Sequence, residues 1–380
     1  MHRMMKIINK RHVDLLVVLL FATLIIPSIY RYCFIDGPDY FAHMRFIEGK
    51  AFGDLISLGL PHLTVHYILL NISNVFNVTL NTTFFVFTVL SILGLAIVKV
   101  LFVRYSLPNA EKYRVGFLAG ITMLMGAIYF PLFNSYSYLG IWSPLAYHNP
   151  TSTWLKPVAL LTIFIYFKLL DDDRKNIKQS WLLALLIFLG AVIKPNFALC
   201  FIPVLFMDML FRKKVYQGVL IILPTLCVLL GQYLITFAAD IEQKSSVVFT
   251  LAGPWSVYSN NILGAIIQNL LAPILITYTL FKIEAFSHKY KLIWSIVLVA
   301  LLQGLFLAES GHRYEGMNFI WGYVVAVDIL FLVSVVEFTR NIDSYSSKWK
   351  KTVVSILALH AICGLAFIVL TGVGRGPFSV

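Results

Sequence analysis

Apolar segments about as long as a bilayer-spanning helix follow one another along almost the whole chain. Charged residues make up only 13% of its 380 residues, whereas a soluble domain carries roughly 25%. No stretch of about 50 residues, the lower limit for an independent domain, lacks such a segment. The sequence therefore predicts an all-α polytopic membrane protein that forms a single transmembrane domain over residues 1–380.

The apolar segments predict about eleven transmembrane helices. Two short ones are separated by Lys194-Pro195-Asn196. Because proline removes a backbone donor and disfavours helix at the residue before it, we expect a hairpin there. The first span has no small-residue cleavage site after it and is expected to be retained. The predicted spans are 13–31, 82–103, 115–133, 153–170, 180–194, 196–211, 215–237, 261–282, 290–308, 319–338 and 352–372.

The residues between the first two spans, 32–81, predict an extracytoplasmic loop. Its segment 55–80 is apolar but contains Pro61, His62 and His66. A segment of this kind that starts and ends on the same side of the membrane is expected to form juxtamembrane, interfacial or re-entrant helices.

The connections between the spans alternate between Lys/Arg-rich and Lys/Arg-poor. With the N-terminus in the cytoplasm, 22 of the 30 Lys and Arg residues, Lys99 among them, fall on the inner side, and 8, including Lys156, fall outside. The positive-inside rule favours this orientation. It also accounts for the net charge of +12, so no nucleic-acid partner is expected. The four scattered cysteines indicate neither a disulfide framework nor a zinc site.

The candidate catalytic residue lies in the first outer loop. Asp39 and His43 are four residues apart and share one face of a predicted helix. Asp39 could instead be a first-turn carboxylate that the helix dipole favours, although Asp36-Gly37-Pro38 already supplies a turn. Asp36 and Asp39 together could hold a divalent cation, and the sequence indicates no other metal site.

Further polar groups fall in the later outer connections. An aromatic–His–Asn cluster that includes Trp142 precedes the fourth span, a lysine lies in the hairpin, and a charged segment separates spans nine and ten. Charges so close to hydrocarbon usually pair or serve a substrate. The structural alternatives are helix-start signals, a lysine that reaches the headgroups, and a Glu–Arg pair within the charged segment. The candidate binding residues are Asp36, His43, His148, Asn149, Lys194, Glu309, His312, Arg313 and Asn318.

Asp328 and His360 are the only ionisable residues expected deep within the bilayer. Residues of this kind are candidates for function, and these two could also hydrogen-bond to each other. No chain of acidic residues follows them across the membrane, which argues against a proton-driven pump.

The motifs and the topology resemble the GT-C superfamily of integral-membrane glycosyltransferases, in particular bacterial proteins of surface-polysaccharide (O-antigen and lipopolysaccharide) assembly. The resemblance covers the topology of most of the chain. It departs from the family in two respects: the sequence shows no large C-terminal soluble domain, and Asp36 could take the place of Asp39 in the motif. The matching stretches run from Asp39 to His43, from Tyr147 to Thr151, from Lys194 to Asn196 and from Glu309 to Gly322.

The resemblance implies transfer of a sugar from a polyprenyl-phosphate donor, undecaprenyl phosphate in bacteria, to a glycan or lipid-linked acceptor. The site would face the periplasm from the bacterial inner membrane. Asp39 would act as general base in a single displacement that inverts the anomeric carbon. Lys194 and Arg313 would stabilise the leaving phosphate. The residues that would orient donor or acceptor are His43, His148 and Glu309.

Other functions stay open at this stage. An O-antigen or capsule polymerase would join lipid-linked repeat units at the same face and usually needs more outer arginines. A flippase or transporter of lipid-linked glycans would need polar groups across the bilayer, and a membrane acyltransferase would use a histidine near the lipid. A eukaryotic lumenal mannosyltransferase is a further alternative, because acceptor sequons begin at Asn71, Asn77 and Asn81.

Overall fold

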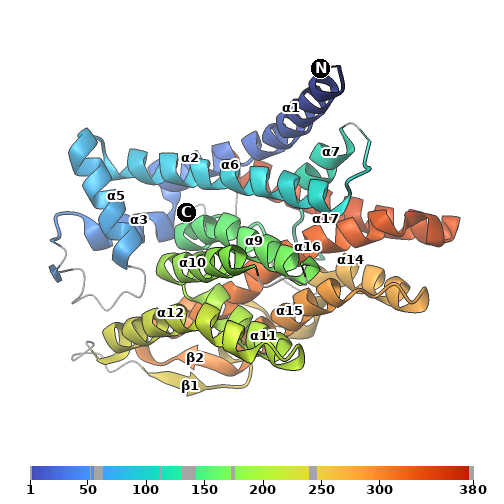
Figure 1. Cartoon of the computed structure of the whole chain (residues 1–380). Coiled ribbons are helices and arrows are strands. Elements are labelled where there is room, and N and C mark those ends of the chain that lie inside the picture. The colour runs from blue at the N-terminus through green and yellow to red at the C-terminus, as the bar shows by residue number, and fades with distance from the viewer. Residues whose placement is uncertain are drawn as a thin grey trace.

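The computed structural model describes residues 2–51, 53–54, 63–111, 113–130, 143–172, 176–238 and 246–375, without the side chains of residues 2–11, 63 and 312. These residues form a bundle of helices with a short two-stranded ribbon at one end (Figure 1).

Long apolar helices make up most of the described chain. Within it, seven helices are long and apolar enough to cross a membrane, and an eighth span results if the pair His12–Thr23 and Ile26–Asp36, bent by 41°, counts as one. The prediction of an all-α protein with several membrane-spanning helices is therefore confirmed, whereas the number eleven stays a prediction. The main helices are α1 (His2–Thr23), α2 (Ile26–Arg31), α6 (Leu80–Ser106), α9 (Pro150–Asp171), α10 (Ile177–Ile193), α11 (Asn196–Phe211), α12 (Val215–Tyr233), α14 (Ile262–Lys282), α15 (His288–Phe306), α16 (Trp321–Arg340) and α17 (Ser347–Gly372).

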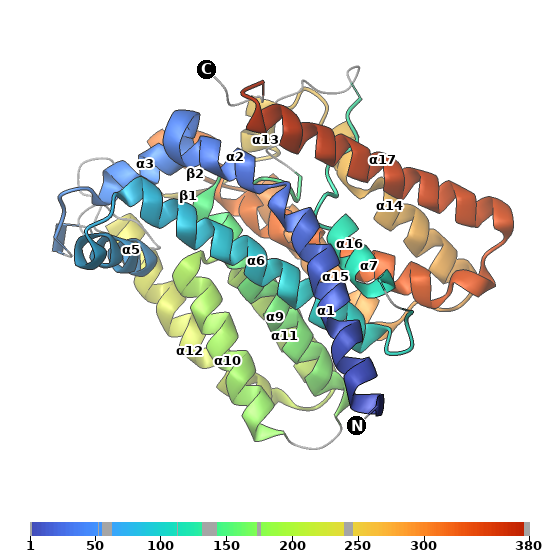
Figure 2. The same ribbon diagram turned by 90° about the horizontal axis from the view of Figure 1, so that it is seen from above.

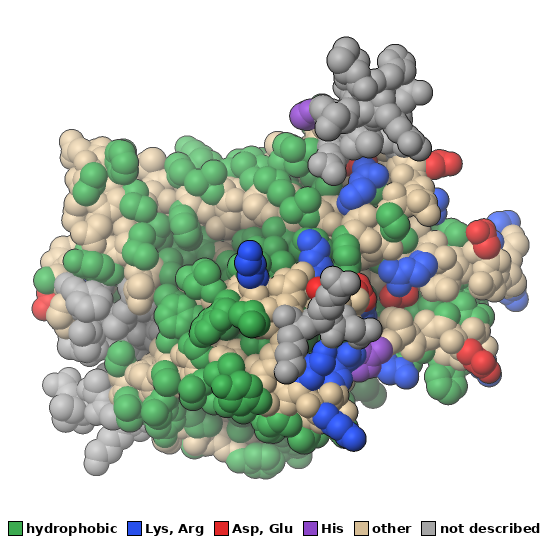
Figure 3. Space-filling model, in the orientation of Figure 1, with side chains coloured by type: hydrophobic (Ala, Val, Ile, Leu, Met, Phe, Trp, Pro, Cys, Tyr) green, Lys and Arg blue, Asp and Glu red, His purple; other side chains and the backbone are tan. Residues whose placement is uncertain are grey.

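The bundle has two distinct ends. At one, which we call the basic end, Lys289 at the start of α15 lies 2.5 Å from Asp171 at the end of α9, and Arg340 donates to the Ser106 carbonyl at the end of α6. At the other, which we call the site end, α9, α11 and α16 begin. Figure 3 shows the Lys and Arg side chains gathered towards the basic end and hydrophobic side chains over much of the remaining face.

Helix α16 is the core of the bundle. All its residues from Trp321 to Phe338 are buried, because it packs against α9, α11, α14 and α15. Figure 2 shows α10 and α12 on one side of the bundle and α14 and α17 on the opposite side. A helix that is apolar on every face, as this one nearly is, requires such an enclosed position.

The predicted hairpin is present. Helix α10 ends at Ile193 and α11 begins at Asn196, with Lys194 in extended backbone between them. Pro195 stands immediately before α11 with a φ of −66°. A proline costs nothing there, because the first backbone N–H groups of a helix have no helical acceptor.

The prediction of a spanning helix at 115–133 is wrong for the part that the structure describes. Helix α7 covers only Arg114–Ile121, and residues 122–130 are not helical. This segment instead lies directly on α17, where a Cβ on Gly364 would come within 1.8 Å of the Leu124 carbonyl oxygen. The high hydropathy of the segment indicates that it lies away from water, but it does not specify whether the backbone is helical.

Neighbouring helices satisfy the backbone of this non-helical segment. The N–H of Gly126 donates to the carbonyl of His360 at 3.2 Å, and that of Ile128 donates to the carbonyl of Gln268 at 2.9 Å. The imidazole Nδ1 of His360 lies 2.6 Å from the Gly126 oxygen. Irregular backbone at membrane depth is tolerated where it is enclosed by protein in this way.

The alternative that Asp328 and His360 hydrogen-bond to each other is wrong, because Nδ1 of His360 contacts the Gly126 oxygen of the non-helical segment. Asp328 on α16 accepts from Lys99 on α6 at 2.8 Å, and Lys99 also donates to the Thr122 carbonyl at 3.0 Å. Lys99 is fully buried, so it belongs to the interior rather than to the basic end. Its assignment to the inner side in the charge count is thereby corrected.

A second interior lysine, Lys156, lies on α9. It is buried, donates to the Pro144 carbonyl at 2.5 Å and lies 4.0 Å from the centre of the Tyr147 ring. Both contacts hold the segment that leads into α9. Lys156 therefore stabilises the site end from the interior of the bundle and is not an exposed outer cation.

The first loop contains helices α3 (Pro38–Ile47) and α5 (Leu63–Phe76). Helix α5 exposes Ile68, Ile72 and other apolar side chains, as the predicted interfacial helix would. Pro61 and His62 of the predicted segment lie outside the described residues.

A short ribbon closes the site end. Strand β1 (Val247–Phe249) pairs antiparallel with β2 (Leu307–Glu309), so that Val247 lies opposite Glu309. The six-residue helix α13 (Gly253–Tyr258) follows β1. The ribbon fixes the position of Glu309 beside the first turns of α11 and α16.

Candidate active site

Asp39 lies in the first turn of α3, at the site end. Gly37 precedes the helix and Pro38 opens it. A Cβ on Gly37 would lie 2.0 Å from the Tyr32 carbonyl oxygen, so the turn into α3 requires glycine. Oδ2 of Asp39 accepts a 3.0 Å hydrogen bond from Nδ2 of Asn149. Its other oxygen has no hydrogen-bond partner among the described residues, and the side chain is part-exposed.

Asn149 joins the candidate base to a lysine. Its Oδ1 caps α9 by accepting from the Ser152 N–H at 3.0 Å, as an N-cap asparagine commonly does. The same oxygen accepts from Lys194 Nζ at 3.0 Å. Helix capping therefore fixes the amide in the orientation that places Asp39 and Lys194 on its two sides.

Lys194 is a buried cation with uncharged partners. Nζ donates to Asn149 and, at 3.1 Å, to Oγ1 of Thr151, and it lies 4.7 Å from the centre of the Trp321 ring. Burial lowers the pKa of Lys194 to about 7, although Asp39 and Glu309 favour its charged form. A partly desolvated ammonium held by neutral oxygens is suited to receive an anion.

A cavity of about 210 Å³ opens beside Lys194. Its polar side carries Glu309 and Asn318, where Nδ2 of Asn318 donates to Oε2 of Glu309 at 2.6 Å. Asn196 at the start of α11 donates to the Asn318 carbonyl. The apolar part of the lining, which we call the apolar wall, is formed by Leu199, Leu229, Tyr233, Phe237 and Phe319.

Two of the predicted histidines lie close to this group and are buried. The ring of His148 lies 5.5 Å from that of Trp321, and burial lowers the pKa of His148 to about 4. Nδ1 of His43 lies 2.8 Å from Nε2 of His66, and burial, followed by the charge of neighbouring groups, lowers the pKa of His43. Both are neutral near pH 7, so they can position ligands and do not supply charge.

The structure does not bring every predicted residue into the site. Asp36 is engaged by Arg31, whose Nε donates to its Oδ2 at 2.9 Å, which leaves it poorly placed to share a cation with Asp39. Arg313 lies in a 3-10 turn, Gly311–Gly316, and is not among the residues that line the cavity. Among the described residues, no three His, Cys, Asp or Glu side chains are grouped to hold a metal ion.

Glu309, one of the two carboxylates of the charged segment, accepts a hydrogen bond from Asn318. The side chain of His312 and all of Trp142 lie outside the described residues.

Some lining residues were missed in the sequence. Gln232 and Tyr233 at the end of α12 and Thr236 in the turn that continues it line the cavity, and the sequence predicts only a transmembrane span there. Two polar side chains four residues apart, Gln232 and Thr236, are the signal that could have singled out this helix end. Gln232 donates to the Ala191 carbonyl of α10 at 2.7 Å, which ties the two helices together beside Lys194.

No protein-family model, curated protein or solved structure matches this chain. The site combines a part-exposed carboxylate able to accept a proton, a buried lysine able to receive an anion, and an apolar wall.

Proposed function

We propose that the chain is a membrane glycosyltransferase of the GT-C kind that transfers a sugar from a polyprenyl-phosphate donor to a glycan or lipid-linked acceptor. The observation that carries this proposal is the bridge from Asp39 through Asn149 to Lys194 beside the cavity. It joins a candidate base and a candidate phosphate-binding cation in one hydrogen-bonded group.

In the proposed reaction, the free carboxylate oxygen of Asp39 takes the proton of an acceptor hydroxyl while the hydroxyl oxygen attacks the anomeric carbon. The bond from that carbon to the phosphate oxygen breaks, and its electron pair stays on the phosphate. Lys194 stabilises the negative charge that develops there. A single displacement of this kind inverts the anomeric carbon and requires no carboxylate nucleophile.

The apolar wall supports a donor that carries a hydrocarbon chain. Its residues Leu229, Tyr233 and Phe237 belong to α12 and the turn that continues it. Only 22% of the most apolar 18 residues of this segment, Val215–Phe237, are buried inside the protein. A prenyl chain could thus lie against α12 while the phosphate reaches Lys194. The distribution of Lys and Arg favours an extracytoplasmic site, and we place the protein in a bacterial inner membrane.

The interior of the bundle gives less support to a flippase or transporter. The buried charges Lys99 and Asp328 satisfy each other, and α16 is enclosed along its length. Polar groups that thread the membrane for a passing glycan would instead be expected to face a water-filled path.

The proposal is tested with the purified chain in lipid vesicles. A panel of undecaprenyl-phosphate donors, each with a different radiolabelled sugar, is offered together with glycan and lipid-linked acceptors. We expect that one donor of the panel supports transfer, and that each acceptor molecule receives a single sugar. A ladder of products from lipid-diphosphate-linked repeat units would identify a polymerase instead. Absence of transfer from every donor, with no binding of undecaprenyl phosphate, would reject the proposal.

Lys194 gives the site a testable dependence on pH. Because its pKa is lowered to about 7, the ammonium is charged below that pH and loses its proton above it. Binding of radiolabelled undecaprenyl phosphate is therefore expected to weaken as the pH rises through about 7. Lys194→Arg keeps its charge across this range and should retain the ligand at higher pH. Lys194→Met should bind roughly tenfold or more weakly at low pH, because a hydrogen bond to a charged group contributes about 1.5–3 kcal/mol.

Equilibrium binding in detergent micelles provides the measurement. If Lys194→Met binds with the affinity and pH profile of the parent chain, the titrating group is another residue, and the role given to Lys194 is wrong.

A further inference from the structure

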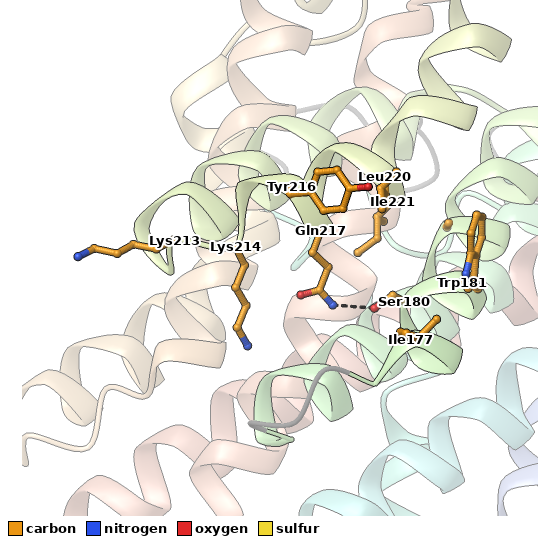
Figure 4. Close-up of a pocket in the computed structure, with 10 residues that line it drawn as sticks. Ile177, Ser180, Trp181, Lys213, Lys214, Tyr216, Gln217, Leu220 and Ile221 are labelled. Carbon is orange, nitrogen blue, oxygen red and sulfur yellow. Dashed lines mark hydrogen bonds between the residues drawn. The ribbon is translucent and has the colours of Figure 1, made fainter.

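A second cavity lies at the basic end, far from the candidate active site. It is a groove of about 390 Å³ between α10 and α12. Its floor contains a 2.6 Å hydrogen bond from Gln217 Nε2 to Ser180 Oγ. Figure 4 shows Trp181 on one side of the groove and Lys213 and Lys214 at its end. The groove therefore combines an apolar channel with a positively charged mouth.

The turn between α11 and α12 holds the two lysines in place. The N–H of Lys213 donates to the Leu210 carbonyl at 3.0 Å, and that of Lys214 donates to the Met209 carbonyl at 2.8 Å. Lys213 has a φ of +57°, in the left-handed region where a helix end usually carries glycine. The tight turn therefore places both lysines directly before the first turn of α12.

The three cations of this turn differ in whether a carboxylate neutralises them. Arg212 lies 3.0 Å from Asp208 and is neutralised by it. Lys213 is exposed and Lys214 is half-buried, and neither has a carboxylate partner within the described part of the chain. The turn therefore leaves two unpaired cations at the mouth of the groove, of which Lys213 extends outward from the turn (Figure 4).

The rest of the groove is suited to the interfacial region of a bilayer. Trp181 and Tyr216 are 61% and 78% exposed, and aromatic side chains of this kind collect where headgroups meet hydrocarbon. Leu220 and Ile221 of α12 form the apolar lining of this groove beyond Gln217. From Lys214 to Ile221 the helix rises by about 10 Å, which spans a phosphate headgroup and the first part of an acyl chain.

We propose that this groove is a binding site for one anionic glycerophospholipid of the leaflet at the basic end. The phosphate lies beside Lys214, to which the neighbouring Lys213 adds positive charge, the headgroup hydroxyls reach Gln217 and Ser180, and one acyl chain follows Leu220 and Ile221 past Trp181. The positive charge at the mouth selects an anionic lipid over a zwitterionic one, since each lysine near a membrane surface favours anionic lipid about fivefold. The site is separate from the proposed glycosyl transfer.

Native mass spectrometry of the full chain in detergent tests this proposal, with phosphatidylglycerol and phosphatidylcholine as the lipids. One phosphatidylglycerol is expected to bind saturably. The double variant Lys213→Gln/Lys214→Gln should weaken that binding about 25-fold and leave the weaker binding of phosphatidylcholine unchanged. The matched control is Lys348→Gln/Lys350→Gln, which removes the same charge from the basic end at the start of α17.

A further variant tests the position of the acyl chain. Leu220→Trp places a larger side chain in the groove, at a part-exposed site that should leave folding intact, and should weaken binding while both lysines remain. Equal loss of phosphatidylglycerol from both double variants would reduce the effect to net charge and overturn the proposal. Equal affinity for phosphatidylcholine, or a chain dimer that Leu220→Trp disrupts, would overturn it as well.

Discussion

Replacing Asp39 with Asn is expected to lower the rate of sugar transfer at least about 100-fold, because general base catalysis typically contributes a factor of 10² to 10⁴. The amide cannot take up the acceptor proton at neutral pH. It has the same shape and can still accept the hydrogen bond from Asn149. Binding of undecaprenyl phosphate and thermal unfolding should therefore stay close to those of the parent chain.

Asp36→Asn is the matched control for this experiment. Asp36 is also a carboxylate of the first loop, and the amide oxygen of the variant can still accept the hydrogen bonds from Arg31. Transfer by this variant should persist. Full transfer by Asp39→Asn would remove Asp39 from the mechanism, and loss of transfer in Asp36→Asn alone would move the base to Asp36.

Asp328→Asn is expected to lower the free energy of unfolding by roughly 3–5 kcal/mol, which is typical when one partner of a buried ion pair is removed. The reason is that Lys99 would keep its charge in the interior of the bundle with no carboxylate to balance it. Lys99 also holds the Thr122 carbonyl at the end of α7. The loss is measured by reversible unfolding in mixed micelles.

The control for this second experiment removes both charges. Lys99→Met/Asp328→Leu removes both members of the ion pair and should recover most of the lost stability, less about 1 kcal/mol for the hydrogen bond to Thr122. A single variant as stable as the parent chain, or a double variant less stable than the single one, would show that the pair does not act in this way.

Much of the architecture could be predicted because apolar length and proline position are local properties of a sequence. The hairpin at Lys194 follows from one proline between two short apolar runs. The gathering of Asp39, Asn149 and Lys194 follows from alternating spans, since every second connection must reach the same end of the bundle. Sequence reasoning could place these residues at one end, but it could not specify the hydrogen bonds that join them.

The remaining features depend on contacts between distant parts of the chain. Lys99 and Asp328 are 229 residues apart, and the sequence around each gives no sign of the other. The non-helical segment after α7 exists because Gly364 of α17 lets it approach closely. Asp36 is taken up by Arg31, only five residues away, and two carboxylates in one loop could not be ranked without seeing which of them was already paired.

The unequal enclosure of α16 and α12 has a consequence for how a ligand could arrive. In the most apolar 18 residues of each segment, 94% are buried in Arg313–Arg340, which contains α16, and only 22% in Val215–Phe237, which contains α12. Helix α12 packs against α10 and α11 on one side, and the rest of its surface faces the hydrocarbon beside the cavity. A molecule with a long hydrocarbon chain can therefore enter the cavity from the plane of the bilayer, and its chain does not have to cross water.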